Sequence, residues 1–325
     1  MKTPSLHALI KPGLSTFILL LITYLAIWGG HLLWWPYFSD ASSTLLIDSG
    51  WSPVYHVLAL LFLVAINSVL LRRFVLHFSI IRIKSFLPVF LFLVFTVTWP
   101  ELRMDLYAHL FLTAFLLSLE FFFGMFRNRT AVEQSFLGSL IISLLSLVEP
   151  LYLLIIPIVW TGFLILKSLS LRTWLASLTG LAIPWIFFNA YFWSKGIFTE
   201  VAPELVLLLQ PTLYFPVHNP QFLVFIGLIS GSVIILLIGL FRKILDDSIQ
   251  TRKYIYVLFL LMMAIILFLV VYQQNAARFL PLLAFFLAIL LAHPFSLLKP
   301  AIYPILFYCI IALHLFLLIS QYLFI

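Results

Sequence analysis

The densest cluster of ionisable side chains in this sequence lies between two apolar runs, in the stretch 99–109. Within it, Glu101, Asp105 and His109 are spaced by four residues, so they would share one helix face, drifting by about 40° per step. Two carboxylates and an imidazole on one face could bind a divalent cation or transfer a proton. The simpler alternative is a capped helix start, because carboxylates are favoured near a helix N-terminus.

Two more carboxylates lie in or between apolar runs. Glu149, followed by Pro150, interrupts the run 134–167. A carboxyl group buried there without a partner would hold its proton more tightly and could act as a general acid or base, whereas at a turn that reaches water it would be an ordinary turn residue. Glu120 precedes Arg127 by seven residues on the same helix face, which favours a structural ion pair. Together with His109, Glu120 and Glu149 are the candidate membrane-embedded polar residues.

Arg278 precedes an apolar run and stands just before Pro281. A guanidinium group at the start of such a helix could hold a lipid phosphate through two hydrogen bonds, with Arg103 as a second ligand. The alternative is a boundary arginine whose head reaches the membrane surface and pairs with a carboxylate. A different loop holds Asp246 and Asp247 among four cations of 242–253. We interpret that loop as solvated and attracted to anionic lipid.

The composition shows which kind of fold must position these residues. Of the 325 residues, 64% are hydrophobic and only 9% are charged, so the bilayer must act as the solvent. The net charge of +7 is scattered over short loops, which excludes a nucleic-acid surface and indicates membrane topology. The single cysteine excludes disulfides within the chain. No nucleotide-binding or zinc-protease motif occurs, so no cofactor is evident beyond the divalent cation considered above.

Apolar runs predict an all-α fold, a polytopic membrane helix bundle that forms a single transmembrane domain over 1–325. Period-2 alternation, which a membrane β-barrel requires, is absent from them. We expect about eleven spanning helices, at 14–35, 53–71, 86–100, 106–126, 134–148, 151–167, 174–194, 221–241, 254–272, 279–295 and 301–323.

The basic residues orient these helices. With the N-terminus in the cytoplasm and the C-terminus outside, all of the 18 Lys and Arg lie inside except Arg103, Lys195 and Arg278. This pattern also favours two short helices joined at Glu149 over one kinked helix across 134–167. Only the hairpin keeps Arg127 and Arg172 on one side of the membrane.

Two resemblances follow from these features. From the basic pair 82–84 through Trp99-Pro100 and the hairpin to Leu171-Arg172-Thr173-Trp174, the chain resembles an uncharacterised family of polytopic inner-membrane proteins from Bacteroidota-type bacteria. That resemblance implies a location in a bacterial inner membrane.

The sequence Arg278-Phe279-Leu280-Pro281 and the Glu149-Pro150 hairpin are similar to features of the C-type membrane glycosyltransferases, which use a polyprenyl-phosphate-linked sugar. This resemblance implies a catalytic carboxylate in the first outside loop, at Asp40 or Asp48. That loop is short here, about 17 residues, and it lacks an adjacent acidic pair.

Three functions remain open from the sequence. The first is a glycosyltransferase-like protein at the outer face, with Asp40, Asp48, Glu101 or Asp105 as catalytic carboxylates and with Arg278 and Arg103 binding phosphate. The second is a transporter or flippase of lipid or a small solute, which would use His109, Glu149 and Glu120. The third is a non-catalytic subunit of an envelope assembly. In every case membrane lipid is the expected partner.

Overall fold

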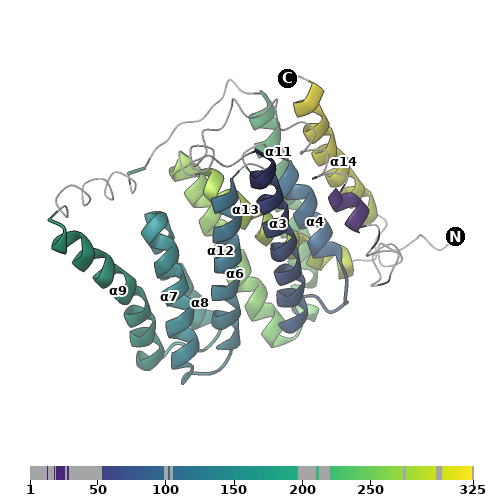
Figure 1. Cartoon of the computed structure of the whole chain (residues 1–325). Helices are drawn as coiled ribbons and strands as arrows, with labels where there is room; N and C mark the ends of the chain where they lie inside the picture. The colour runs from purple at the N-terminus through teal and green to yellow at the C-terminus, as the bar shows by residue number, and fades with distance from the viewer. Residues whose placement is uncertain are drawn as a thin grey trace. The chain divides into compact units, whose positions relative to one another are not determined.

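All elements formed in the described part of the chain are helices, which confirms the all-α prediction (Figure 1). The computed structural model describes residues 13, 18, 20–25, 28, 53–98, 102, 105–196, 210–211, 220–273, 276–297 and 302–323. The longer helices are α3 (Pro53–His77), α4 (Leu87–Val97), α6 (Leu106–Gly124), α7 (Val132–Val148), α8 (Ile156–Ile165), α9 (Leu171–Ser194), α11 (Pro220–Lys243), α12 (Ile249–Val271), α13 (Ala276–Leu297) and α14 (Ile302–Leu323). Two short 3₁₀ helices are η2 (Pro150–Ile155) and η3 (Ile244–Asp246).

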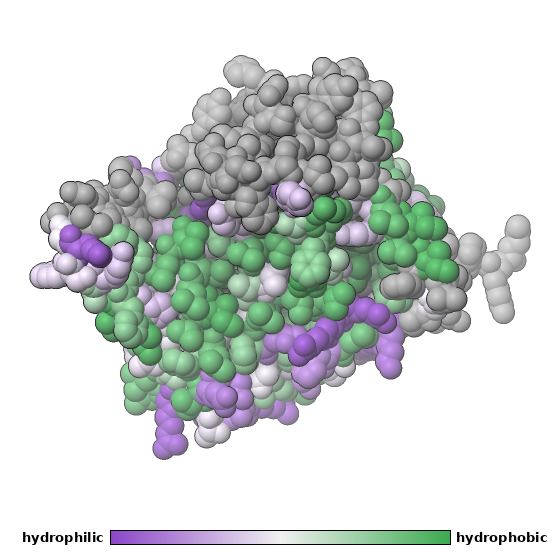
Figure 2. Space-filling model, viewed as in Figure 1, coloured by the Kyte–Doolittle hydropathy of each residue, from purple (hydrophilic) through white to green (hydrophobic). Residues whose placement is uncertain are grey.

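Seven of the described helices are long and apolar enough to cross a membrane, namely those within α3, α6, α9, α11, α12, α13 and α14. Three shorter apolar helices lie at Leu87–Val97, Val132–Val148 and Pro150–Ile165. The predicted runs from 53 onwards therefore each correspond to a helix, and the protein is a multi-pass membrane protein. Most of the run 14–35 lies outside the described residues. Figure 2 shows hydrophobic residues over most of the coloured helix sides, with hydrophilic residues gathered near helix ends.

The chain folds as two compact units. Unit 1 comprises Met1–Leu110, Phe215–Ser248 and Ala277–Ile325, and unit 2 comprises Phe111–Tyr214 and Ile249–Ala276. In unit 1, α4 packs on α3 and α14, and α11 packs on α14. In unit 2, α7 packs on α9 and α8 packs on α12. Helix α13 of unit 1 is buried from Phe279 to Ser296.

Helices α7 and α9 of unit 2 lie side by side in parallel (Figure 1). The Ser135 hydroxyl donates to the Thr173 carbonyl, and the Ser143 hydroxyl donates to the Leu181 carbonyl, so paired residues keep a constant offset of 38. A Cβ added to Gly180 would lie only 2.5 Å from the Phe136 carbonyl oxygen. The backbones therefore approach too closely for any larger residue, as is usual where small residues line a membrane helix interface.

This parallel arrangement confirms the predicted hairpin across 134–167. The Arg127 amide donates to the Leu166 carbonyl over 3.0 Å, and the Ser170 hydroxyl donates to the Arg129 carbonyl over 2.7 Å. The start of α7 and the end of α8 therefore lie at the same end of unit 2. Between α7 and η2, Glu149 adopts an extended conformation (φ −129°, ψ 94°), and Pro150 begins the returning helix, where its missing amide costs nothing.

Candidate functional site

The described residues from Asp105 to His109 of the predicted polar stretch lie at the start of α6. Asp105 accepts a hydrogen bond from the Ala108 amide through Oδ1 at 2.9 Å, which is the geometry of an N-cap carboxylate. The capped-helix interpretation is therefore confirmed for Asp105. Glu101, Arg103, Asp40 and Asp48 lie outside the described residues.

His109, one turn further along α6, is completely buried. Its Nε2 lies 2.9 Å from the Leu102 carbonyl oxygen, and because a carbonyl can only accept, Nε2 carries the proton. The Trp28 ring packs against the imidazole in a T-shaped arrangement, with ring centroids 6.2 Å apart. Asn67 on α3 donates to the His109 carbonyl over 3.0 Å. These contacts link Leu102 and α3 to the first turns of α6.

A small cavity of about 20 Å³ adjoins this end of unit 1. Leu102 and Leu280 both line it, together with Ser232 of α11 and His314 of α14. The volume is sufficient for one water molecule. The Ser232 hydroxyl is buried and has no hydrogen-bond partner among the described residues. The start of α13, which carries the partly buried Arg278, therefore lies close to Leu102 in the stretch that precedes α6.

Glu149 and Glu120 belong to unit 2, whereas the described residues that line the cavity belong to unit 1. The Glu149 side chain is 1% exposed, so the interpretation of a water-exposed turn is wrong. The Glu149 carbonyl accepts from the Tyr152 amide over 3.1 Å, and Tyr152 is itself buried against Phe111. Glu120 is partly buried within α6.

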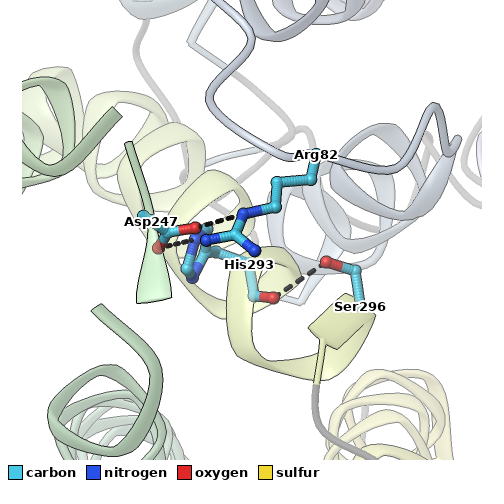
Figure 3. A network of polar contacts seen from close by, with 4 residues as sticks. All are labelled: Arg82, Asp247, His293 and Ser296. Atoms are coloured by element: carbon cyan, nitrogen blue, oxygen red, sulfur yellow. Dashed lines mark hydrogen bonds and ion pairs between the residues drawn. The ribbon is translucent and has the colours of Figure 1, made fainter. Parts of the chain in front are cut away.

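A second polar site, which the sequence analysis missed, lies at the other end of α13. Asp247 Oδ1 lies 2.8 Å from Arg82 Nε, and Asp247 Oδ2 lies 2.9 Å from His293 Nε2 (Figure 3). We call Arg82, Asp247 and His293 the ionic cluster. The Asp247 and His293 side chains are fully buried, whereas the Arg82 side chain is 45% exposed. The Ser296 hydroxyl donates to the His293 carbonyl over 2.8 Å and so holds the last turn of α13.

The ionic cluster corrects our interpretation of loop 242–253 as solvated. Asp246 is exposed as expected, but its neighbour Asp247 points inward to α13. Burial alone would raise the pKa of Asp247, but the hydrogen bonds and charges of His293 and Arg82 outweigh it. The pKa of Asp247 therefore lies below its usual value. The group remains an ionised carboxylate at neutral pH, shared between an imidazole and a guanidinium.

The two polar sites lie at opposite ends of one buried helix. Arg278 and His293 are fifteen residues apart on α13, which corresponds to about 22 Å along the helix axis. At the Arg278 end, the Gln321 amide of α14 also donates to the Thr98 carbonyl over 2.7 Å. No group of three metal-ligating side chains occurs among the described residues.

Comparisons with known proteins found no matching family model, curated protein or solved structure.

Proposed function

We propose that this protein acts on a phosphate-bearing, lipid-linked substrate at the Arg278 end of unit 1, in the manner of a polyprenyl-phosphate-dependent glycosyltransferase. One observation carries the proposal. Leu102 and Leu280 line the same cavity, so the stretch rich in carboxylates and the arginine-bearing start of α13 are neighbours. A guanidinium beside carboxylates provides the two charges that sugar transfer from a phosphate requires.

The chemistry assigns a role to each residue. A carboxylate of Asp40, Asp48 or Glu101 removes the proton from the acceptor hydroxyl. The acceptor oxygen forms the new bond to the anomeric carbon while the bond from that carbon to the phosphate oxygen breaks. Arg278, with Arg103, stabilises the negative charge left on the polyprenyl phosphate. Asp105 keeps α6 in place through its cap, because its Oδ1 is engaged with the Ala108 amide.

The membrane topology follows from the same proposal. We place the Arg278 end at the outer face of a bacterial inner membrane, with about eleven helices and a cytoplasmic N-terminus. The support is the charge distribution along the chain. The hairpin at Glu149 agrees with this topology. The Arg127 amide donates to the carbonyl of Leu166, the residue before Lys167, so both basic residues lie at one end of unit 2.

Sugar transfer from a radiolabelled polyprenyl-phosphate donor, assayed in membranes, tests this function. Alanine variants of Asp40, Asp48, Glu101, Asp105 and Arg278 are compared with Lys195→Ala, which removes another cation predicted to lie outside. We expect one acid variant to abolish transfer and Arg278→Ala to reduce it, with Lys195→Ala unchanged. Transfer that persists in all variants rejects the proposal.

The ionic cluster favours a second candidate function, a proton-coupled transporter or flippase. Buried ionisable groups within membrane proteins commonly lie on ion or substrate pathways. Asp247 and His293 are such a pair, and His109, Glu149 and Glu120 would be further relay groups. Uptake or lipid translocation in vesicles that does not respond to an imposed pH gradient counts against this function.

A further inference from the structure

A surface groove runs between the starts of α7 and α9 in unit 2. The groove is open to the surface and has a volume of about 680 Å³. The residues that line it are mostly apolar, with one acid and one base: Val132, Glu133, Phe136, Arg172, Leu175, Ala176 and Thr179.

The two charged residues of this groove are not paired with each other. Both are exposed, and neither forms an ion pair within the part of the chain that the structure describes. Glu133 lies in the first turn of α7, where the helix dipole favours a carboxylate. Arg172 lies in the first turn of α9, where the same dipole disfavours a cation, so helix stability does not explain it.

The groove continues from the helix ends along an apolar surface. Because α7 and α9 are parallel, their charged first turns lie at the same end of unit 2. From Arg172 to Thr179 the groove extends by about 10 Å along α9, over the exposed side chain of Leu175. Figure 2 shows the matching pattern of hydrophilic residues near helix ends and hydrophobic residues along helix sides. A ligand of this groove therefore has a charged head and an apolar chain.

We propose that this groove binds a phospholipid whose headgroup carries both a phosphodiester and a primary ammonium, as in phosphatidylethanolamine. Arg172 donates hydrogen bonds to the phosphate, and Glu133 accepts hydrogen bonds from the ammonium group. An acyl chain lies along Phe136, Leu175 and Thr179. The headgroup places an anion at Arg172 and an N–H donor at Glu133. A purely anionic headgroup lacks the cation, and a quaternary amine carries the positive charge but has no N–H to donate to the carboxylate.

The competing explanation is a nonspecific attraction of anionic lipid to the basic end of unit 2. Arg127, Arg129 and Lys167 are all exposed, and basic residues near a membrane surface attract anionic lipid in general. That explanation predicts binding that depends on lipid charge alone. The carboxylate of Glu133 inside the groove opposes an anionic headgroup at this position.

Native mass spectrometry of the purified, delipidated full chain tests the proposal. Phosphatidylethanolamine, phosphatidylcholine and phosphatidylglycerol with identical acyl chains are titrated separately into the wild type, Glu133→Gln, Arg172→Ala and Thr179→Trp. Lys167→Ala is the matched control, because Lys167 is an exposed cation that does not line the groove.

We expect the wild type to bind phosphatidylethanolamine about tenfold more tightly than either other lipid. Glu133→Gln removes that preference, Arg172→Ala weakens binding of all three lipids, and Thr179→Trp blocks the path of the acyl chain. Lys167→Ala leaves the preference intact. Equal binding of phosphatidylethanolamine and phosphatidylcholine by the wild type, or tightest binding of phosphatidylglycerol, overturns the proposal even if a variant fails to fold.

Discussion

The ionic cluster of unit 1 and the α7–α9 interface of unit 2 hold their helices together with different chemistry. In unit 1, the ionic cluster joins the loop after α3, the segment before α12 and the last turn of α13 through the single carboxylate of Asp247. In unit 2, α7 and α9 are joined by neutral groups. The hydroxyls of Ser139 and Ser177 lie 2.7 Å apart, and the Trp185 indole donates to Ser146 over 2.9 Å.

This difference follows from the cost of removing charge from water. A hydroxyl or indole loses little free energy on entering an apolar region if it finds a partner, so such groups can line a helix along its length. An ionised carboxylate loses far more, so it is placed at a helix end. There Arg82 remains about half exposed and His293 completes the pairing.

The largest effect is expected from a change to the neutral interface of unit 2. Gly180→Ala places a methyl group 2.5 Å from the Phe136 carbonyl oxygen, which is backbone and cannot rotate away. We expect a loss of about 3 kcal/mol in the free energy of unfolding in mixed micelles. Gly227→Ala on α11 is the control, because nothing lies within 4 Å of its added Cβ. If both variants are equally stable, α7 and α9 do not approach each other as closely as described above.

The second-largest loss of stability is expected from a change to the ionic cluster. Asp247→Asn removes the charge that Arg82 and His293 share. We expect it to lower the free energy of unfolding by about 2–3 kcal/mol, a value that already allows for the partial exposure of Arg82. Asp246→Asn, at the exposed neighbouring position, is expected to change stability by less than about 0.5 kcal/mol. Thermal unfolding in detergent measures both. Equal effects of the two variants contradict the inward orientation of Asp247.

The same cluster predicts a dependence on pH that the interface of α7 and α9 lacks. Because the pKa of Asp247 is lower in the folded protein, its contribution is complete above the ordinary aspartate value and is lost as pH falls through the lowered pKa. The difference in melting temperature between the wild type and Asp247→Asn should therefore shrink between pH 7 and pH values near 3. A difference that stays constant over that range contradicts the role of the charged carboxylate.

The smallest effect is expected from single hydroxyls of unit 2. Ser139→Ala removes one neutral hydrogen bond and should lower the free energy of unfolding by about 0.6 kcal/mol. Ser177 also accepts from the Trp160 indole over 3.0 Å, so Ser177→Ala should cost more. A double-mutant cycle measures the coupling between Ser139 and Ser177. Zero coupling means that these hydroxyls do not interact in the folded protein.

The sequence predicts the helices well, because their signal is local. Apolar length alone located the runs from 53 onwards, and basic residues together with Glu149-Pro150 indicated the hairpin. The cap at Asp105 was also predictable, because it depends on residues three positions apart. The serines at 135, 139, 143 and 146 share a helical face, a spacing visible in the sequence that we did not use.

The ionic cluster could not be predicted in the same way. Arg82 and Asp247 look like ordinary loop charges, and their pairing depends on how distant helices pack. One signal was available, since His293 is an ionisable residue inside the predicted apolar run 279–295 and such residues usually face a partner. Nothing in the sequence identified Asp247, rather than Asp246, as that partner.

The central claim is that the two ends of α13 differ in function, with Arg278 binding a lipid-linked phosphate and Arg82 serving structure. Equilibrium binding of a polyprenyl-phosphate-linked sugar to the wild type, Arg278→Ala and Arg82→Ala tests it most directly, at a temperature where all three are folded. We predict that Arg278→Ala weakens binding at least about tenfold and that Arg82→Ala does not. Binding that is unchanged in Arg278→Ala, or equally weakened in both variants, contradicts the claim.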